Sequence, residues 1–117
     1  MSIKRLHVGP RMSQAVIHGG VAYLAGQVAN NAKGKSVTDQ TKDILTAIDG
    51  LLAEAGTSKA KLLTAQIWLT DMKTFAEMNA VWDGWVAAGN TPARATVQSP
   101  ALAAPGYDVE IMVAAAI

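Results

Sequence analysis

One arginine stands alone in a long stretch of the sequence that otherwise carries no charge. Over residues 84–107, Arg94 is the only charged side chain, and it lies between Pro92 and a run of small and apolar residues. A planar guanidinium can hold a carboxylate through two parallel hydrogen bonds, so an isolated arginine is a candidate carboxylate-binding group. The plainer interpretations are a structural ion pair or a side chain that extends to water.

A single carboxylate interrupts the apolar segment near the end of the chain. Glu110 lies within residues 109–113, and a period of two places its side chain on the face opposite Val109, Ile111 and Val113. A carboxylate in this position could orient a water molecule and take its proton as a general base. The alternatives are a charge that protects a sheet edge from aggregation, or a direct ion pair with Arg94.

The composition argues against several other kinds of site. The sequence has no cysteine, which excludes disulfides, thiolate zinc sites and a thiol nucleophile. Its two histidines, His7 and His18, have no carboxylate pattern between them, so we expect no metal site. Ten basic and nine acidic residues give a net charge of +1, and we therefore expect no nucleic-acid partner.

Length and hydrophobicity bound the architecture. The 117 residues predict one domain, 1–117, without a signal peptide or a membrane-spanning segment, and hence a cytoplasmic protein with no membrane partner. Half of the residues are hydrophobic and only 16% are charged. So apolar a composition in so small a domain predicts that part of its surface is buried in an oligomer.

Hydrophobic periodicity predicts elements in the order strand, strand, helix, strand, helix, strand, strand. Each helix joins two strands, so both should cover one face of a sheet and leave a half-apolar face open for a partner. Asp71 is a candidate N-cap of the second helix, which Gly89 and Asn90 should end. The expected strands are 15–17, 21–28, 61–70, 94–98 and 107–115, with an added edge strand in the first eight residues, and the first helix is expected at 38–55.

Five short motifs resemble the RidA family, also called YjgF. In family order and spacing, and across essentially the whole chain, they are Met12-Ser13-Gln14-Ala15-Val16, Tyr23-Leu24-Ala25-Gly26-Gln27-Val28, Asn79-Ala80-Val81-Trp82, Pro92-Ala93-Arg94 and Val109-Glu110-Ile111. The resemblance implies a chorismate-mutase-like α+β fold, a mixed six-stranded sheet with two helices on one face. It also implies a homotrimer joined through the open sheet faces, with a ligand cleft at each subunit interface.

The resemblance further implies an activity, the hydrolysis of reactive 2-imino and enamino acids to 2-keto acids and ammonia, without a metal or organic cofactor. Arg94 falls on the family's carboxylate-binding arginine, and Glu110 falls on its water-positioning glutamate. Asn79 matches an asparagine of the cleft, and Gly26 matches a glycine that contributes its backbone. Arg94, Asn79, Gly26, Met12 and Thr96 are therefore the expected substrate-binding residues, with Arg94 and Glu110 as the catalytic pair.

Departures from the family pattern predict a divergent subgroup. Met12 replaces a tyrosine whose hydroxyl would contact the ligand, Ala95-Thr96 replaces a Ser-Cys pair, and Met112 replaces a second glutamate. Two hypotheses follow: a deaminase acting on a small carboxylate substrate, favoured by Arg94 and Glu110, and a non-catalytic trimer that binds small carboxylates or other metabolites, favoured by the lost tyrosine. An endoribonuclease is disfavoured by the near-neutral charge and the lack of a histidine acid/base pair.

Overall fold

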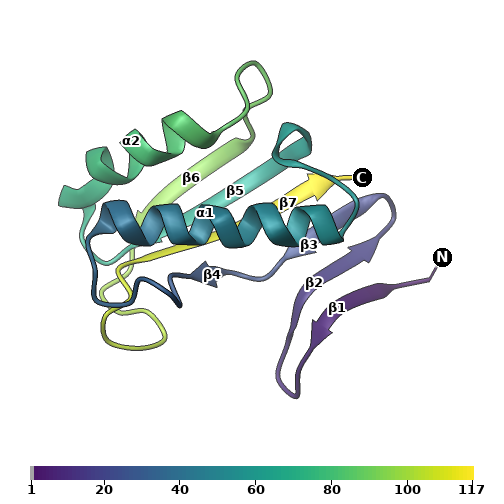
Figure 1. Cartoon of the computed structure of the whole chain (residues 1–117), viewed down its shortest axis with the longest axis horizontal. Helices are drawn as coiled ribbons and strands as arrows, with labels where there is room; N and C mark the ends of the chain where they lie inside the picture. Colours follow the sequence, from purple (N-terminus) through teal and green to yellow (C-terminus); the bar gives the residue numbers. More distant parts are fainter. Residues whose placement is uncertain (1) are drawn as a thin grey trace.

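The fold is one mixed sheet with two helices packed on the same face (Figure 1). The structure is a computed structural model, and it describes residues 2–117. The sheet order is β1-β2-β3-β7-β5-β6, with β4 also paired to β7, and only β5 and β6 run parallel. The elements are β1 (Lys4–Val8), β2 (Ser13–His18), β3 (Val21–Leu24), β4 (Gln27–Val28), α1 (Val37–Glu54), β5 (Leu62–Leu69), α2 (Phe75–Trp85), β6 (Ala93–Gln98) and β7 (Val109–Ala116).

The prediction of the first helix is confirmed by α1. The residues that begin and end this helix act through contacts within a few positions of the chain. The Ser36 side chain accepts a hydrogen bond from the Asp39 backbone N–H, which caps the first turn. Gly56 follows the helix with φ of +84°, the left-handed conformation that ends many helices. Neither helix, within residues 2–117, is long and apolar enough to cross a membrane. The buried stripe of α1 includes Ile44, Leu45, Ile48, Leu51 and Leu52.

The second helix is shorter than predicted at both ends. Asp71 does cap a turn, since its side chain accepts from the Lys73 N–H, but that turn is a 3-10 turn at Met72–Thr74. The α-helix begins only at Phe75. It ends at Trp85, before the predicted Gly89–Asn90 stop, because Val86 is already extended, with ψ of 143°.

The predicted strand 21–28 is interrupted, and the prediction of one continuous strand is wrong. The Ala25 N–H donates to the Gln14 carbonyl, away from β7. Tyr23 pairs with Ala114 but Gln27 pairs with Ile111, so one extra residue lies on the β3–β4 side, as in a β-bulge. The bulge gives the sheet seven strands in six positions, where six strands were expected.

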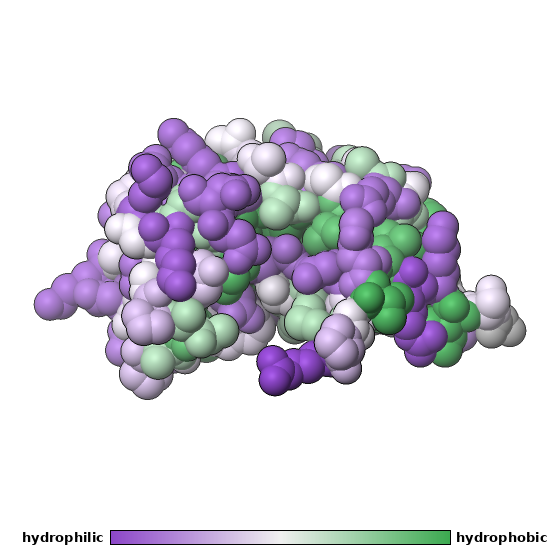
Figure 2. Space-filling model, turned by 60° about the horizontal axis from the view of Figure 1, so that its bottom comes forward, coloured by the Kyte–Doolittle hydropathy of each residue, from purple (hydrophilic) through white to green (hydrophobic). Residues whose placement is uncertain are grey.

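The two faces of the sheet differ in burial. Ile67, Leu69, Val109 and Ile111 alternate along β5 and β7 and are completely buried beneath the helices. As predicted, the opposite face is half apolar and open, and it carries Tyr23, Trp68, Val97 and Met112 with Gln66 and Glu110. Figure 2 brings the lower edge of Figure 1 forward, and hydrophobic residues lie there among hydrophilic ones.

Candidate functional site

Arg94 lies on the helix side of β6, the edge strand beneath α2. Its Cα pairs with that of Ala65, a buried residue of the helix face, so the two side chains point the same way. The guanidinium carbon lies 5.2 Å from the ring centroid of Trp82 and 5.9 Å from that of Phe75. Both distances are within reach of a cation–π interaction. Two aromatic residues of α2 therefore hold the guanidinium against the helix.

Three buried polar atoms in this region have no hydrogen-bond partner. They are Arg94 Nη1, Asn79 Oδ1 and Thr96 Oγ1. Thr96 follows Arg94 by two residues on the same face of β6, and Asn79 lies between Phe75 and Trp82 along one side of α2. Buried polar groups are nearly always paired, because an unpaired one costs free energy. The three unpaired atoms lie around one place between α2 and β6 and make it a candidate site for a polar group.

Arg94 makes no salt bridge with any residue that the structure describes. The ion pairs within residues 2–117 are limited to the contact between His7 and Glu54. The structural ion pair considered for Arg94 from the sequence is therefore wrong. The guanidinium carries an uncompensated positive charge beside Asn79 and Thr96, which is the electrostatic setting that a carboxylate requires.

Glu110 lies on the opposite, open face of β7. Its Cα pairs with Trp68 on one side and Val28 on the other. Glu110 lines a cavity of about 590 Å³ together with Met12, Gly26 and Ala103, which we call the Glu110 cavity. Burial raises the pKa of the Glu110 carboxyl above its ordinary value. A raised pKa makes the ionised carboxylate a stronger base, which suits proton transfer from water.

Gly26 fits closely against the Glu110 carboxylate. An added Cβ would overlap Glu110 Oε2 and lie 3.0 Å from its Cδ. The carboxylate can occupy its position only because residue 26 has no side chain. The β-bulge described above lies at this point, which agrees with the frequent occurrence of bulges beside active sites.

The predicted site residues form two groups on opposite faces of the sheet. Arg94 points with Ala65 toward the helices, whereas Glu110 points with Trp68 to the open face. Within one chain, the direct ion pair between Arg94 and Glu110 considered from the sequence is therefore wrong. Although its side chain points to the helices, Arg94 also borders a hollow of about 530 Å³, whose lining includes Tyr23 and Met112 of the open face. One group is Arg94, Asn79 and Thr96, and the other is Glu110, Gly26 and Met12.

Comparison with known proteins matches the whole chain to one family. The family model described as "Endoribonuclease L-PSP" matches residues 2–117. The chain belongs to the RidA (YjgF) family. It is 44% identical over 115 residues to a RutC family protein of Haemophilus influenzae, covering 98% of each chain. It is 41% identical to the RutC family protein YoaB of Escherichia coli over the full length of both.

Solved structures of RidA-family proteins share this fold. A crystal structure of a YjgF family member from Neisseria meningitidis is 47% identical, with a TM-score of 0.94 over 99% of this chain and 95% of the other. A second, described as a putative translation initiation inhibitor from Salmonella typhimurium, is 40% identical with a TM-score of 0.88, covering 99% and 98%. The α+β fold with a mixed sheet is therefore confirmed, whereas the homotrimer stays a prediction.

The candidate site also includes two aromatic residues whose role the sequence did not predict. From the sequence, the helical spacing of Phe75 and Trp82 predicts only that both belong to the apolar stripe of the second helix. Trp82 is indeed buried, but Phe75 is 37% exposed and both rings face Arg94. The available signal was the spacing of 75, 79 and 82, which places Asn79 between two aromatic residues on one side of a helix.

The histidines of this RidA-family chain belong to neither group of site residues, and neither lines the Glu110 cavity. His7 Nε2 lies 2.6 Å from Glu54 Oε2 at the protein surface. His18 contacts the Ser2 carbonyl at 3.4 Å. Across residues 2–117, no three His, Cys, Asp or Glu side chains are close enough together to hold a metal ion.

Proposed function

We propose that this RidA-family chain hydrolyses 2-imino and enamino acids to 2-keto acids and ammonia, in a cleft between the subunits of a homotrimer. The observation that carries the proposal is the half-buried Arg94, which has no salt bridge within residues 2–117 and whose Nη1 is unpaired, as are the buried side-chain oxygens of Asn79 and Thr96. A small carboxylate substrate would satisfy these atoms. Membership of the RidA family supports the same function.

Arg94 is the binding half of the proposed site. Its guanidinium accommodates a substrate carboxylate through two parallel hydrogen bonds, and the rings of Phe75 and Trp82 fix its position. The Asn79 amide and the Thr96 hydroxyl are then available to the atoms next to the carboxylate. These contacts fix the imine carbon, the atom that must react, relative to the protein.

Two subunits are required to bring the halves together. Arg94 lies at the β6 edge on the helix side, whereas Glu110 lies on the open face. A neighbouring copy whose open face covers this edge would place its own Glu110 cavity beside Arg94. Covering the open face would also bury the exposed apolar side chains of Tyr23, Val97 and Met112, which is favourable. Repeated head-to-tail contacts of this kind can close into a ring of three.

Glu110 is the chemical half of the proposed site. Its ionised carboxylate accepts a proton from a water molecule as the water oxygen bonds to the imine carbon and the C=N electron pair moves to nitrogen. The nitrogen takes a proton from solvent, which gives a carbinolamine. The C–N bond then breaks, ammonia leaves with the proton held by Glu110, and the hydroxyl returns its proton to solvent as the keto group forms. Positioning and one base supply the acceleration.

A second function is favoured by one residue. Met12 lines the Glu110 cavity where the family pattern has a tyrosine, so a flexible thioether replaces a hydroxyl that could bind the ligand. This substitution favours a non-catalytic trimer that binds small carboxylates. The endoribonuclease activity in the name of the family model has no such support, because neither histidine lines the Glu110 cavity or the hollow beside Arg94.

A trapping assay separates the two functions. An amino-acid oxidase generates the 2-imino acid, and semicarbazide traps whatever imine persists as an adduct. The protein should suppress formation of the adduct, and Arg94→Ala should abolish the suppression. Lys61→Ala, which removes an exposed cation outside both groups of site residues, serves as the control and should remain active.

The outcomes distinguish the alternatives. If the adduct forms unhindered with several amino acids while calorimetry detects 2-keto acid binding, the chain is the binding protein and not the deaminase. If Arg94→Ala keeps full activity, the carboxylate assignment is wrong. Light scattering tests the assembly: three copies of the 12.2 kDa chain are expected, and the mass of a single chain would contradict the trimer.

A further inference from the structure

His7 has an unusual backbone conformation for a strand residue. Its φ is +51°, whereas all the other described residues with positive φ are glycines. The left-handed region is unfavourable for a residue with a Cβ, because the Cβ approaches the following carbonyl oxygen. Strained conformations of this kind persist only where the surrounding structure over-determines them. The neighbours of His7 must therefore supply the compensation.

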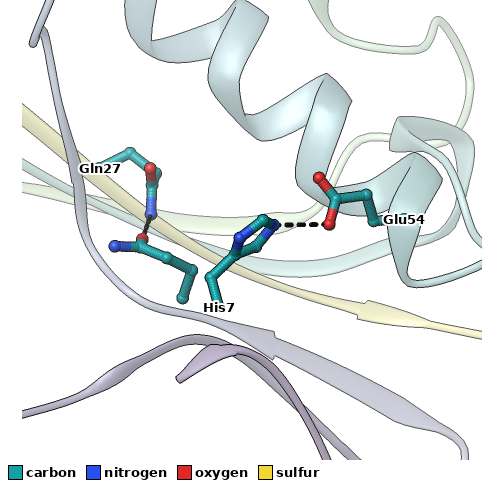
Figure 3. A network of polar contacts seen from close by, with 4 residues as sticks. His7, Gln27 and Glu54 are labelled. Atoms are coloured by element: carbon teal, nitrogen blue, oxygen red, sulfur yellow. Dashed lines mark hydrogen bonds and ion pairs between the residues drawn. The ribbon is translucent and has the colours of Figure 1, made fainter. Parts of the chain in front are cut away.

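The positive φ turns the His7 side chain toward helix α1. Alternation along β1 would place it beside Arg5 on the open face, since Leu6 packs against the core. Instead, His7 Nε2 lies 2.6 Å from Glu54 Oε2, in the last residue of α1 (Figure 3). This contact, which we call the His7–Glu54 strap, joins the outermost strand to the helix layer.

The strap lies next to the proposed site. A cavity of about 300 Å³ beside His7 and Glu54 is lined by Gln14, Gln27 and Asn30, and the same three residues line the Glu110 cavity. Gln27 donates to the Gln14 side chain at 2.9 Å, so these two amides form the wall between the cavities. Figure 3 shows the His7 ring between Glu54 and Gln27.

Strand β1 has few other attachments to the rest of the molecule, whereas β2 is held in the sheet by its pairing with β3. Strand β1 pairs only with β2, and its residues are exposed except for the half-buried Leu6. The turn of this hairpin carries Met12, whose carbonyl accepts from the Gly9 N–H. Met12 then lines the Glu110 cavity. Any movement of β1 and this turn away from α1 therefore moves one wall of that cavity.

We propose that His7 is a positioning residue for this site, which acts through the β1–β2 hairpin to hold Met12 at the wall of the Glu110 cavity. The effect on catalysis rests on the proposed function, whereas the strap itself does not. Both partners are about half exposed, so the strap contributes little to global stability. Local opening of an edge hairpin, however, costs little free energy, so even a weak contact changes how often the hairpin opens.

Hydrogen exchange tests the strap independently of any activity. His7→Gln and Glu54→Gln should each raise amide exchange in β2 and the preceding turn about twofold to fivefold, as expected for loss of one exposed pair, and should leave β5 and β7 unchanged. The double variant His7→Glu with Glu54→Lys puts an ion pair in place of the His7–Glu54 contact and should restore protection. His18→Gln, on the same hairpin, is the matched control. Unchanged exchange in both single variants would overturn the proposal.

Kinetics test the connection to the site. In the trapping assay, both single variants should raise KM about twofold to fivefold with kcat nearly unchanged, because Arg94 and Glu110 are untouched. The charge-reversed double variant should recover the KM. A looser hairpin with an unchanged KM would overturn the positioning role. If the wild-type protein has no deaminase activity, the proposed function fails, and the Kd for a 2-keto acid replaces KM in the same comparison.

Discussion

Arg94 and Glu110 lie on opposite faces of one sheet, and their surroundings differ in kind. Arg94 is held by aromatic rings, and the buried polar atoms beside it lack partners. Glu110 has no such support, but it borders a cavity of about 590 Å³ and fits against a glycine. The Arg94 region suits a carboxylate held in one position, whereas the Glu110 region leaves room for water and for the part of a ligand that reacts.

The difference shows why neither region is a complete site. Within one chain, the side chains of Arg94 and Glu110 point to opposite faces of the sheet, so a carboxylate bound at Arg94 would lie away from the Glu110 base. General acid–base catalysis requires hydrogen-bond reach to the reacting atom. The proposed deaminase reaction therefore requires the proposed assembly, because one chain does not bring the two groups together.

The largest expected effect separates the two roles. Glu110→Gln keeps the shape of the side chain and removes the base, so it should lower kcat in the trapping assay by about 10²- to 10⁴-fold. The KM should change little, because the binding half is intact. Asp83→Asn, at an exposed position of α2, is the control for a lost carboxylate. An equal loss in KM would show that Glu110 binds substrate and is not the base.

Mixed oligomers test whether the halves come from different subunits. Arg94→Ala and Glu110→Gln, each inactive alone, should regain activity when co-expressed at equal levels. In a head-to-tail ring each interface draws its two halves independently, so about a quarter of the clefts would be intact. Activity no higher than that of the single variants would show that a site does not combine Arg94 of one subunit with Glu110 of another.

Local signals made much of the fold predictable from the sequence. Ser36, Asp39 and Gly56 bound helix α1 through contacts within a few residues, and the alternation in strand β5 identified its buried face. The limits of α2 were less predictable, because Asp71 caps a 3-10 turn as readily as an α-helix. The bulge at Gly26 depends on the register between β4 and β7, which no local pattern reports.

The candidate site was predictable as residue types but not as geometry. The lack of other charges around Arg94 singled it out, and the apolar surroundings of Glu110 did the same. Their placement on opposite faces follows from pairing with Ala65 and Trp68, two residues of β5 that are distant in sequence. The aromatic contacts of Arg94 likewise depend on how α2 packs over β6. Such long-range pairings are fixed only by the complete fold.

The dependence of activity on pH should report the ionisation of Glu110. Because burial raises the pKa of the Glu110 carboxyl, kcat/KM should fall about tenfold per pH unit on an acid limb that lies above the ordinary glutamate pKa of about 4.3. The folded state then binds this proton more tightly than the unfolded state. The resulting stability is present below the unfolded pKa and is lost as pH rises through the folded pKa.

Urea unfolding checks the stability consequence of that pKa. Glu110→Gln should become more stable relative to wild type as the pH rises from 4 to 7, because only the wild-type protein has to ionise a desolvated carboxyl. A constant difference across this range would mean that burial does not perturb Glu110. An acid limb at the ordinary glutamate value would lead to the same conclusion.

The smallest expected effect on kcat is that of a substitution at Gly26, beside the Glu110 carboxylate. In Gly26→Ala, the new methyl would overlap Glu110 Oε2, the far end of a flexible side chain, so the carboxylate would move and the backbone would not. The φ of Gly26 is not positive, so alanine adds no backbone strain and the free energy of unfolding should change by less than about 1 kcal/mol. The kcat should fall about fivefold to tenfold, as for a misplaced base.

A second glycine provides the control for this change. Gly50 lies within helix α1 with no atom near the position of an added Cβ, so Gly50→Ala should raise the stability by about 1 kcal/mol and leave kcat unchanged. Full activity in Gly26→Ala would show that the position of the carboxylate against Gly26 is not the reactive one. Glu110 would then act from more than one position in its cavity, whereas the aromatic rings hold Arg94 in one position.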